Sequence, residues 1–178
     1  MFMVQENTTQ KERLKKIYRR VRVIYGTLPP QMEFLGNIDA DYLEEFLKSV
    51  LRLMKHPNID LDIFAFIRLN MAFREGYEYC KMFNSKLLLS KGHTQEVLDM
   101  VVEDIINIPF KDREKALAEF AIKAIYESKS CNQEDFDALY EMGWSQKDVF
   151  DVVEHAGTIF RNGRILTAYY SLAEIAIL

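Results

Sequence analysis

The sequence lacks the features of disulfide-rich, secreted or membrane-spanning proteins. Its 178 residues include two cysteines, four prolines, seven glycines and three histidines. Cys80 and Cys131 alone do not make a disulfide framework. No run approaches the roughly 18 apolar residues of a membrane span, and residues 5–22 are too polar for a signal peptide. These absences predict a cytoplasmic protein with reduced thiols and no stable membrane association.

Charge and motif content exclude further classes. The net charge of −4 and the pI near 5.5 give no reason to expect nucleic acid as a partner. Glycine-rich phosphate loops and a serine nucleophile elbow are absent from the sequence. The histidines and cysteines lack the spacing of metal ligands. We therefore expect no metal and no cofactor.

Helical periodicity dominates what the sequence does contain. Apolar residues are 49% and aromatic residues 12% of the chain, enough for a real core. Apolar spacing predicts helices over 9–25, 39–55, 61–90, 95–106 and 111–128, a short helix from Asn132 to Gly143 and a last one from Ser145. No segment alternates as a strand does. The pattern predicts a single all-α domain of about seven or eight helices.

Segment 61–90 and several glycines of this pattern leave alternatives open. Segment 61–90 is apolar nearly all round, which predicts a helix buried in the core or in a subunit interface. Gly76 within it marks either close packing or a break. Pro29-Pro30 predicts a loop without helix. Gly157 and Gly163 are candidate interruptions of the last helix.

The order of signals from residue 28 onward resembles a known superfamily. The resemblance rests on segments 28–30, 67–72, 79–80, 110–117, 134–139, 142–145 and 148–150, together with Gly92. In this order they are similar to the carboxymuconolactone decarboxylase and alkyl hydroperoxidase D-like superfamily, peroxidase-related branch. The resemblance implies an alkyl hydroperoxidase D-like helical domain over 27–178, preceded by a basic helical extension over 1–26.

The family's active helix carries Cys-x-x-Cys-x-x-x-His, followed by a conserved glycine. Matching that glycine to Gly92 places Cys80 at the second cysteine. Tyr77 then stands at the first cysteine and Asn84 at the histidine. The family's upstream glutamate falls near Ala65, where there is no carboxylate. The resemblance therefore implies an active helix from which one thiol and the proton relay are missing.

Three interpretations of Cys80 remain open. A dithiol peroxidase needs a thiolate, a resolving thiol and a proton relay, but Tyr77 cannot form the disulfide and Asn84 cannot act as a base. Cys80 alone permits one-thiol chemistry through a sulfenic acid, with reduction by an outside thiol. The third interpretation, a buried helical cysteine that packs as a small apolar side chain, is favoured over both.

The lactone decarboxylase branch instead requires acid–base groups and a cationic clamp. His155, Arg164 and Arg68 are the candidates for these roles. The favoured alternative is that both arginines pair with carboxylates and that His155 is a partly buried polar residue. His56, in a loop, and His93, beside a helix cap, are expected to be solvated.

The first predicted helix is strongly basic. Against the single acid Glu12 it carries Lys11, Arg13, Lys15, Lys16, Arg19, Arg20 and Arg22. Such a helix suits an anionic membrane, an RNA or an acidic partner. The favoured alternative is that the basic face is solvated and that the helix packs through Leu14, Ile17 and Val21. An acidic neighbouring subunit is one surface on which it could pack.

Two functional hypotheses follow. The first is a hydroperoxidase-like or decarboxylase-like enzyme with an apolar pocket around Cys80. Its catalytic candidates are Cys80 and His155, and its pocket residues are Tyr77, Asn84, Phe83 and Arg68. The second is a non-catalytic helical protein that binds a small apolar ligand or a protein partner. The resemblance implies a homo-oligomer in either case.

Overall fold

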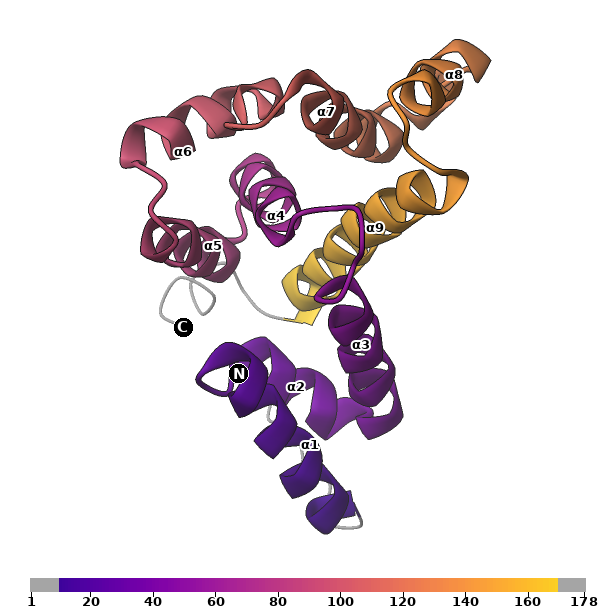
Figure 1. The fold of residues 1–178 in the computed structure, drawn as a ribbon. Helices are drawn as coiled ribbons and strands as arrows, with labels where there is room; N and C mark the ends of the chain where they lie inside the picture. The colour runs from indigo at the N-terminus through magenta and orange to yellow at the C-terminus, as the bar shows by residue number, and fades with distance from the viewer. Residues whose placement is uncertain (1–9, 170–178) are drawn as a thin grey trace. The chain divides into compact units, whose positions relative to one another are not determined.

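The computed structural model describes residues 10–169, and all regular structure within them is helical. Between Lys11 and Tyr169 the structure describes nine α-helices and two short 3-10 helices; Figure 1 shows the α-helices in chain order. The all-α prediction is confirmed, with more helices than the seven or eight expected. No helix in this range is long and apolar enough to cross a membrane.

The described chain divides into two compact units between Lys55 and His56. The N-terminal unit contains α1 (Lys11–Tyr25), α2 (Pro30–Ile38) and α3 (Ala40–Leu53), which contact one another. This division does not coincide with the boundary predicted after residue 26, so a separate extension over 1–26 stays a prediction. The outer ends of the two predicted domains, 1–9 and 170–178, lie outside the described residues.

The basic helix α1 uses its apolar stripe inside its own unit. Leu14, Ile17 and Val21 are buried, as the spacing predicts, and α1 contacts α2 and α3. Arg13 also pairs with Glu44 of α3 at 2.8 Å. The apolar stripe of α1 is therefore covered within the chain.

Helix α2 corrects the prediction of a loop without helix at Pro29-Pro30. Pro29 is extended, with φ −63° and ψ 138°, and Pro30 occupies the first helical position. A proline fits there because that N–H has no partner within a helix and the fixed φ is already helical. Asp39 then separates α2 from α3 and caps α3 by accepting from the backbone N–H of Asp41 at 2.9 Å.

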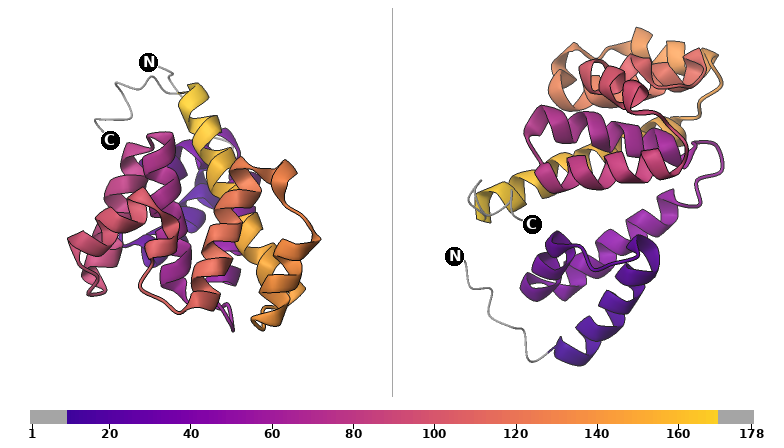
Figure 2. Two further views of the ribbon diagram at one scale, coloured as in Figure 1. Left: turned by 90° about the horizontal axis from the view of Figure 1, so that it is seen from above. Right: turned by 90° about the vertical axis from the view of Figure 1, so that its left-hand side faces the viewer.

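The C-terminal unit is built around one buried helix. Its α-helices are α4 (Leu61–Glu75), α5 (Glu78–Ser90), α6 (Gln95–Glu103), α7 (Asp112–Tyr126), α8 (Gln133–Glu141) and α9 (Gln146–Tyr169), with 3-10 turns η2 (Ile105–Asn107) and η3 (Ser128–Ser130). Helix α4 contacts α5, α6, α7 and α9 (Figure 2). Residues 63–67 and 69–72 are buried, which confirms burial for this segment of the predicted long helix.

The prediction of one continuous helix over 61–90 is wrong. Gly76 adopts φ 74°, a left-handed conformation that glycine reaches without steric cost, and ends α4. The N–H of Tyr77 closes this end on Ala72 O at 2.9 Å. The chain then restarts as α5, with Cys80 in the first turn. Helix α9, by contrast, runs without interruption through Gly163.

Candidate functional site

Three helices of the C-terminal unit bring predicted site residues together. Helix α4 supplies Arg68, α5 supplies Cys80 and Asn84, and α9 supplies His155. Helix α4 contacts both α5 and α9. The break at Gly76 makes this possible, because it lets α5 pack along α4 instead of continuing it.

Asn84 is the centre of this arrangement and is 1% exposed. Its Nδ2 donates to the backbone carbonyl of Cys80 at 2.8 Å. Its Oδ1 accepts from Nε of Arg68 at 2.8 Å. The amide thus ties the first turn of α5 to α4. An amide does not titrate near neutral pH, so it holds this geometry without exchanging a proton.

His155 extends the network from Arg68 into the core. Its Nε2 lies 3.5 Å from Nη1 of Arg68 and 3.3 Å from the carbonyl oxygen of Phe64. Burial, assisted by the Arg68 charge, lowers the pKa of His155 to about 3, although the Phe64 carbonyl acts in the other direction. The imidazole is therefore neutral at pH 7 and linked to the Cys80 turn through Arg68 and Asn84.

The Cys80 thiol is half-buried and protonated at neutral pH. Burial raises its pKa to about 11, because desolvation disfavours the thiolate. The charge of Arg68 acts in the opposite direction but is the smaller effect. This environment differs from that of reactive cysteines, in which nearby positive charge prevails and the pKa falls.

Tyr77, at the place of the family's first cysteine, fills space instead of offering a thiol. It is 8% exposed, and its ring lies so close to Gly163 of α9 that a methyl group there would overlap it. Its hydroxyl has no hydrogen-bond partner among the described residues. Burial, then the charge of Glu75, raises the pKa of Tyr77. The small residue at 163 thus makes room for the large one at 77.

The arrangement of helices matches solved structures, although searches with the sequence find no matching family model and no matching curated protein. An uncharacterized peroxidase-related protein from Silicibacter sp. TM1040 matches with a TM-score of 0.75 at 16% identity, over 89% of this chain and 83% of that protein. An uncharacterized peroxidase-related protein from Ralstonia eutropha JMP134, described as an alkylhydroperoxidase AhpD core, matches with a TM-score of 0.73 at 18% identity, over 94% and 89%. This chain has the AhpD-like fold.

Within the AhpD-like fold, four of the six predicted site residues form one polar network. They are Cys80, Asn84, Arg68 and His155. Tyr77 lies beside this network, against α9. Phe83 stacks on Tyr79 with ring centroids 6.0 Å apart and an interplanar angle of 13°. The network connects α4, α5 and α9 through neutral and cationic groups.

Arg164 is committed to an ion pair in the AhpD-like chain. Its Nη2 lies 2.6 Å from Oε2 of Glu75, whose side chain is 8% exposed. The alternative of a structural pair is thus confirmed for Arg164. Sequence reasoning missed Glu75 as a buried carboxylate, because a charged residue at a helix end is ordinarily solvated.

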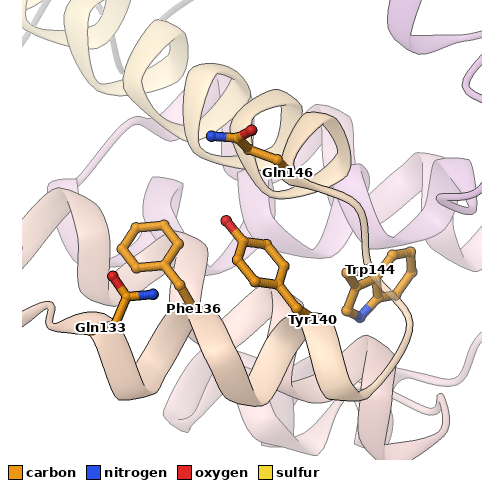
Figure 3. A pocket seen from close by; sticks show the side chains of 5 residues that line it. All are labelled: Gln133, Phe136, Tyr140, Trp144 and Gln146. Atoms are coloured by element: carbon orange, nitrogen blue, oxygen red, sulfur yellow. The ribbon is translucent and has the colours of Figure 1, made fainter.

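A surface hollow lies away from Cys80, where α8 is followed by the start of α9 (Figure 3). Gln133, Phe136, Tyr140, Trp144 and Gln146 line its volume of about 610 Å³. The predicted apolar pocket around Cys80 remains a prediction.

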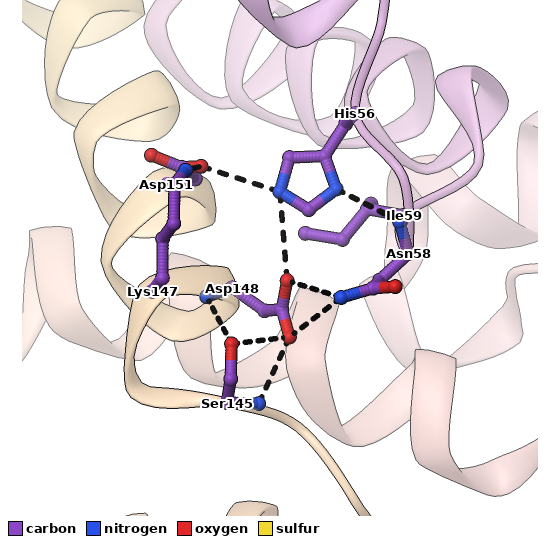
Figure 4. Close-up of polar contacts among 7 residues, drawn as sticks. All are labelled: His56, Asn58, Ile59, Ser145, Lys147, Asp148 and Asp151. Carbon is purple, nitrogen blue, oxygen red and sulfur yellow. Dashed lines mark hydrogen bonds and ion pairs between the residues drawn. The ribbon is translucent and has the colours of Figure 1, made fainter.

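The prediction that His56 is solvated is wrong. Its side chain is 2% exposed, and Nδ1 accepts from the backbone N–H of Asn58 at 3.2 Å and of Ile59 at 3.0 Å (Figure 4). The ring proton therefore resides on Nε2, which lies 3.2 Å from Asp151 and 3.6 Å from Asp148. The loop before α4 folds onto the start of α9, and this folding buries the imidazole.

Asp148 completes this cluster. It is the N3 residue of a capping box in which Ser145 is the N-cap. It accepts from Ser145 N at 2.9 Å, from Ser145 Oγ at 2.6 Å and from Asn58 Nδ2 at 3.1 Å. Burial alone would raise the pKa of Asp148, but these hydrogen bonds outweigh it and lower the pKa. Nδ1 of His56 accepts two backbone hydrogen bonds, Nε2 lies beside two carboxylates, and Asp148 caps α9, so the cluster holds the start of α9 against the preceding loop.

His93 also differs from its prediction. Its Nε2 lies 3.0 Å from Asp62 of α4, and its side chain is 19% exposed. The turn after α5 places it against Phe66, with ring centroids 4.9 Å apart. Across residues 10–169, no three histidine, cysteine or acidic side chains are placed to hold a metal ion.

Proposed function

We propose that this AhpD-fold chain is a binding protein without dithiol peroxidase chemistry, and that it acts as a homo-oligomer on a small apolar ligand or a protein partner. Asn84 carries the proposal. By resemblance, a histidine relay belongs at this position. The amide found there is buried and engages Cys80 and Arg68 with its two ends. It has no proton to exchange near pH 7.

The state of the Cys80 thiol supports the same proposal. With a pKa raised to about 11 by burial, only about one thiol in ten thousand is ionised at pH 7. The thiolate is the form that attacks a peroxide. Tyr77 carries no sulfur, so no disulfide closes on Cys80 from that position.

Consumption of an organic hydroperoxide with excess dithiol tests this proposal. We expect the wild-type protein and Cys80→Ser to show the same background rate. Cys131→Ser is the matched control, since it removes the other thiol and leaves Cys80 in place. Turnover by the wild-type protein and Cys131→Ser that Cys80→Ser lacks would contradict the proposal.

One-thiol redox chemistry is the second candidate, and the charge of Arg68 is the observation that favours it. The Cys80 thiolate would attack a hydroperoxide oxygen and break the O–O bond. Cysteine sulfenic acid would form, and the leaving alkoxide would take a proton. One external thiol would displace water to give a mixed disulfide, and a second would release Cys80 and leave as the external disulfide.

The same assay with a monothiol donor separates the two candidates. One-thiol chemistry predicts turnover that requires Cys80 and that falls in Arg68→Gln, because loss of the guanidinium charge raises the thiol pKa further. The binding proposal predicts the background rate in every variant.

Exposed apolar side chains on α5 support the oligomer. Met82 is 44% exposed and Leu89 is 40% exposed. They lie seven positions apart, so they share one face of the helix. Contiguous exposed apolar surface marks interaction sites, so we take this face of α5 as the candidate interface.

A further inference from the structure

We infer that the hollow beside α8 is a binding site for a small organic ammonium cation. This site is separate from the Cys80 network and concerns a different ligand chemistry. Three aromatic side chains and two amides form it, and they lie on α8, on the connection to α9 and at the start of α9 (Figure 3). Aromatic walls attract ammonium groups because the ring faces carry negative electrostatic potential.

The aromatic walls are held in place by their own contacts. Phe136 and Tyr140 lie one turn apart on α8, with ring centroids 6.3 Å apart and an interplanar angle of 39°. Phe120 braces Phe136 at 5.0 Å. Trp144 is 2% exposed, and its Nε1 donates to the Arg113 carbonyl at 2.8 Å. Tyr140 is 37% exposed and offers its ring to a ligand. Such a preformed site avoids the entropic cost of ordering side chains on binding.

The charge around the hollow favours a cation. Helix α8 carries four acids, Glu134, Asp135, Asp137 and Glu141, and no basic residue. Asp135 is neutralised by Lys123 at 2.8 Å, which leaves three exposed carboxylates. Tyr140 and Glu141 also lie at the carboxyl end of α8, where the helix dipole favours positive charge.

The basic side chains beside the hollow are already paired. Lys147 pairs with Asp151. Arg113 pairs with Glu114 at 3.2 Å and places its guanidinium 3.9 Å from the centre of the Trp144 ring. The Arg113 guanidinium therefore covers one face of the buried Trp144 ring, and the exposed Tyr140 ring is the face offered to a ligand.

The two amide side chains of the hollow, Gln133 and Gln146, favour a ligand that carries a hydroxyl group. Gln133 donates to Asp137 at 2.8 Å, which fixes the orientation of its amide. Its own Oε1 and the Gln146 amide provide hydrogen-bonding groups for a hydroxyl. The acidic charge of α8 disfavours an anion, and a neutral ligand gains only apolar contact. A hydroxylated quaternary ammonium ion satisfies the aromatic, acidic and amide groups together.

Fluorescence of Trp144, the only tryptophan of the chain, reports on this site. The probes are choline and its uncharged isostere dimethylbutanol, in which a tert-butyl group replaces the trimethylammonium group. We expect saturable binding of choline, with the isostere about five- to thirty-fold weaker. Calorimetric titration measures the same affinities independently of the fluorophore.

Two variants locate the binding. Tyr140→Ala removes an aromatic wall and is expected to weaken choline binding at least about fivefold, whereas Tyr169→Ala, an exposed tyrosine elsewhere, leaves it unchanged. Asp137→Asn retains the shape and lowers the affinity for choline alone. Three results overturn the inference: no saturable choline binding by either method, equal affinity for the isostere, or equal loss in Tyr169→Ala.

Discussion

At the scale of single residues, the fate of Cys80 depends on the balance between burial and one charge. Burial raises the pKa of the thiol and Arg68 lowers it, and burial prevails. The resulting value of about 11 lies above the reference value of a free cysteine. The Cys80 thiol is therefore protonated at neutral pH and is not activated by its neighbours.

The pH dependence of Cys80 alkylation tests this balance. In a Cys131→Ser background, the rate with iodoacetamide should still rise by about tenfold per pH unit between pH 7 and pH 9, because the thiolate fraction keeps increasing below the pKa. Arg68→Gln should slow the reaction further, since it removes the charge that favours the thiolate. A rate that levels off near pH 8 would contradict the burial argument.

The lowered pKa of His155 predicts that the fold loses stability in acid. Its folded-state pKa of about 3 lies below the ordinary value of 6.5, so the unfolded chain binds a proton first as the pH falls. Its contribution to stability is complete above pH 6.5 and is lost progressively as the pH falls from 6.5 toward 3. Denaturant unfolding should give a smaller difference in stability between pH 7 and pH 5 for His155→Gln than for the wild-type protein. An unchanged difference would show that folding does not lower the pKa of His155.

The residues of this network were predictable and their partners were not. Resemblance and helical spacing singled out Cys80, Asn84, Arg68 and His155. The Arg68–Asn84 hydrogen bond joins α4 to α5, and Arg68 approaches His155 of α9; no local pattern encodes such contacts. His56 was missed for the same reason, because its burial results from a loop folding onto α9.

At the scale of elements, the packing of Tyr77 on Gly163 fixes the approach of α9. The break at Gly76 was among the alternatives that the sequence offered, since a glycine inside an apolar segment marks either packing or a turn. The pairing of Tyr77 with Gly163 was not visible, because Tyr77 lies in the connection between α4 and α5 and Gly163 lies on α9, far along the chain.

A double-mutant cycle tests this contact. Gly163→Ala should destabilise the fold by about 1–3 kcal/mol, because the new methyl group overlaps the Tyr77 ring. In a Tyr77→Ala background the same change should become stabilising by up to about 1 kcal/mol, since alanine favours helix over glycine.

Gly157→Ala is the matched control on the same helix. A methyl group there meets Ile125 at 3.8 Å, an ordinary contact, so helix propensity alone should decide the outcome. Urea unfolding gives all the values. Equal effects of Gly163→Ala in the two backgrounds would show that the Tyr77–Gly163 contact does not contribute to stability.

At the scale of the whole molecule, the all-α class and the AhpD-like fold followed from the sequence. Helical periodicity repeats along the chain and can be recognised without close sequence similarity. The fold is shared with solved structures at only 16–18% sequence identity. The helix count was underestimated because α2 begins at a proline pair and because α4 and α5 share one apolar pattern. Boundaries depend on caps, which are weaker signals than periodicity.

The proposed homo-oligomer predicts an effect of charge on the exposed face of α5. Met82→Glu combined with Leu89→Glu should reduce the assembly size measured by light scattering while the helical content stays unchanged. Val23→Glu, at a residue that is 81% exposed on α1, is the control and should leave the size unchanged. A monomeric wild-type protein, or an assembly indifferent to the double variant, would remove α5 as the interface.

The most direct test of the central claim is trapping of oxidised Cys80. The wild-type protein is treated with excess organic hydroperoxide in the presence of dimedone, and intact mass with peptide mapping identifies any adduct. We expect Cys80 to stay unmodified, because the thiol is protonated and Asn84 provides no relay. A stoichiometric dimedone adduct at Cys80, formed at neutral pH within the time of the turnover assay, would contradict this expectation.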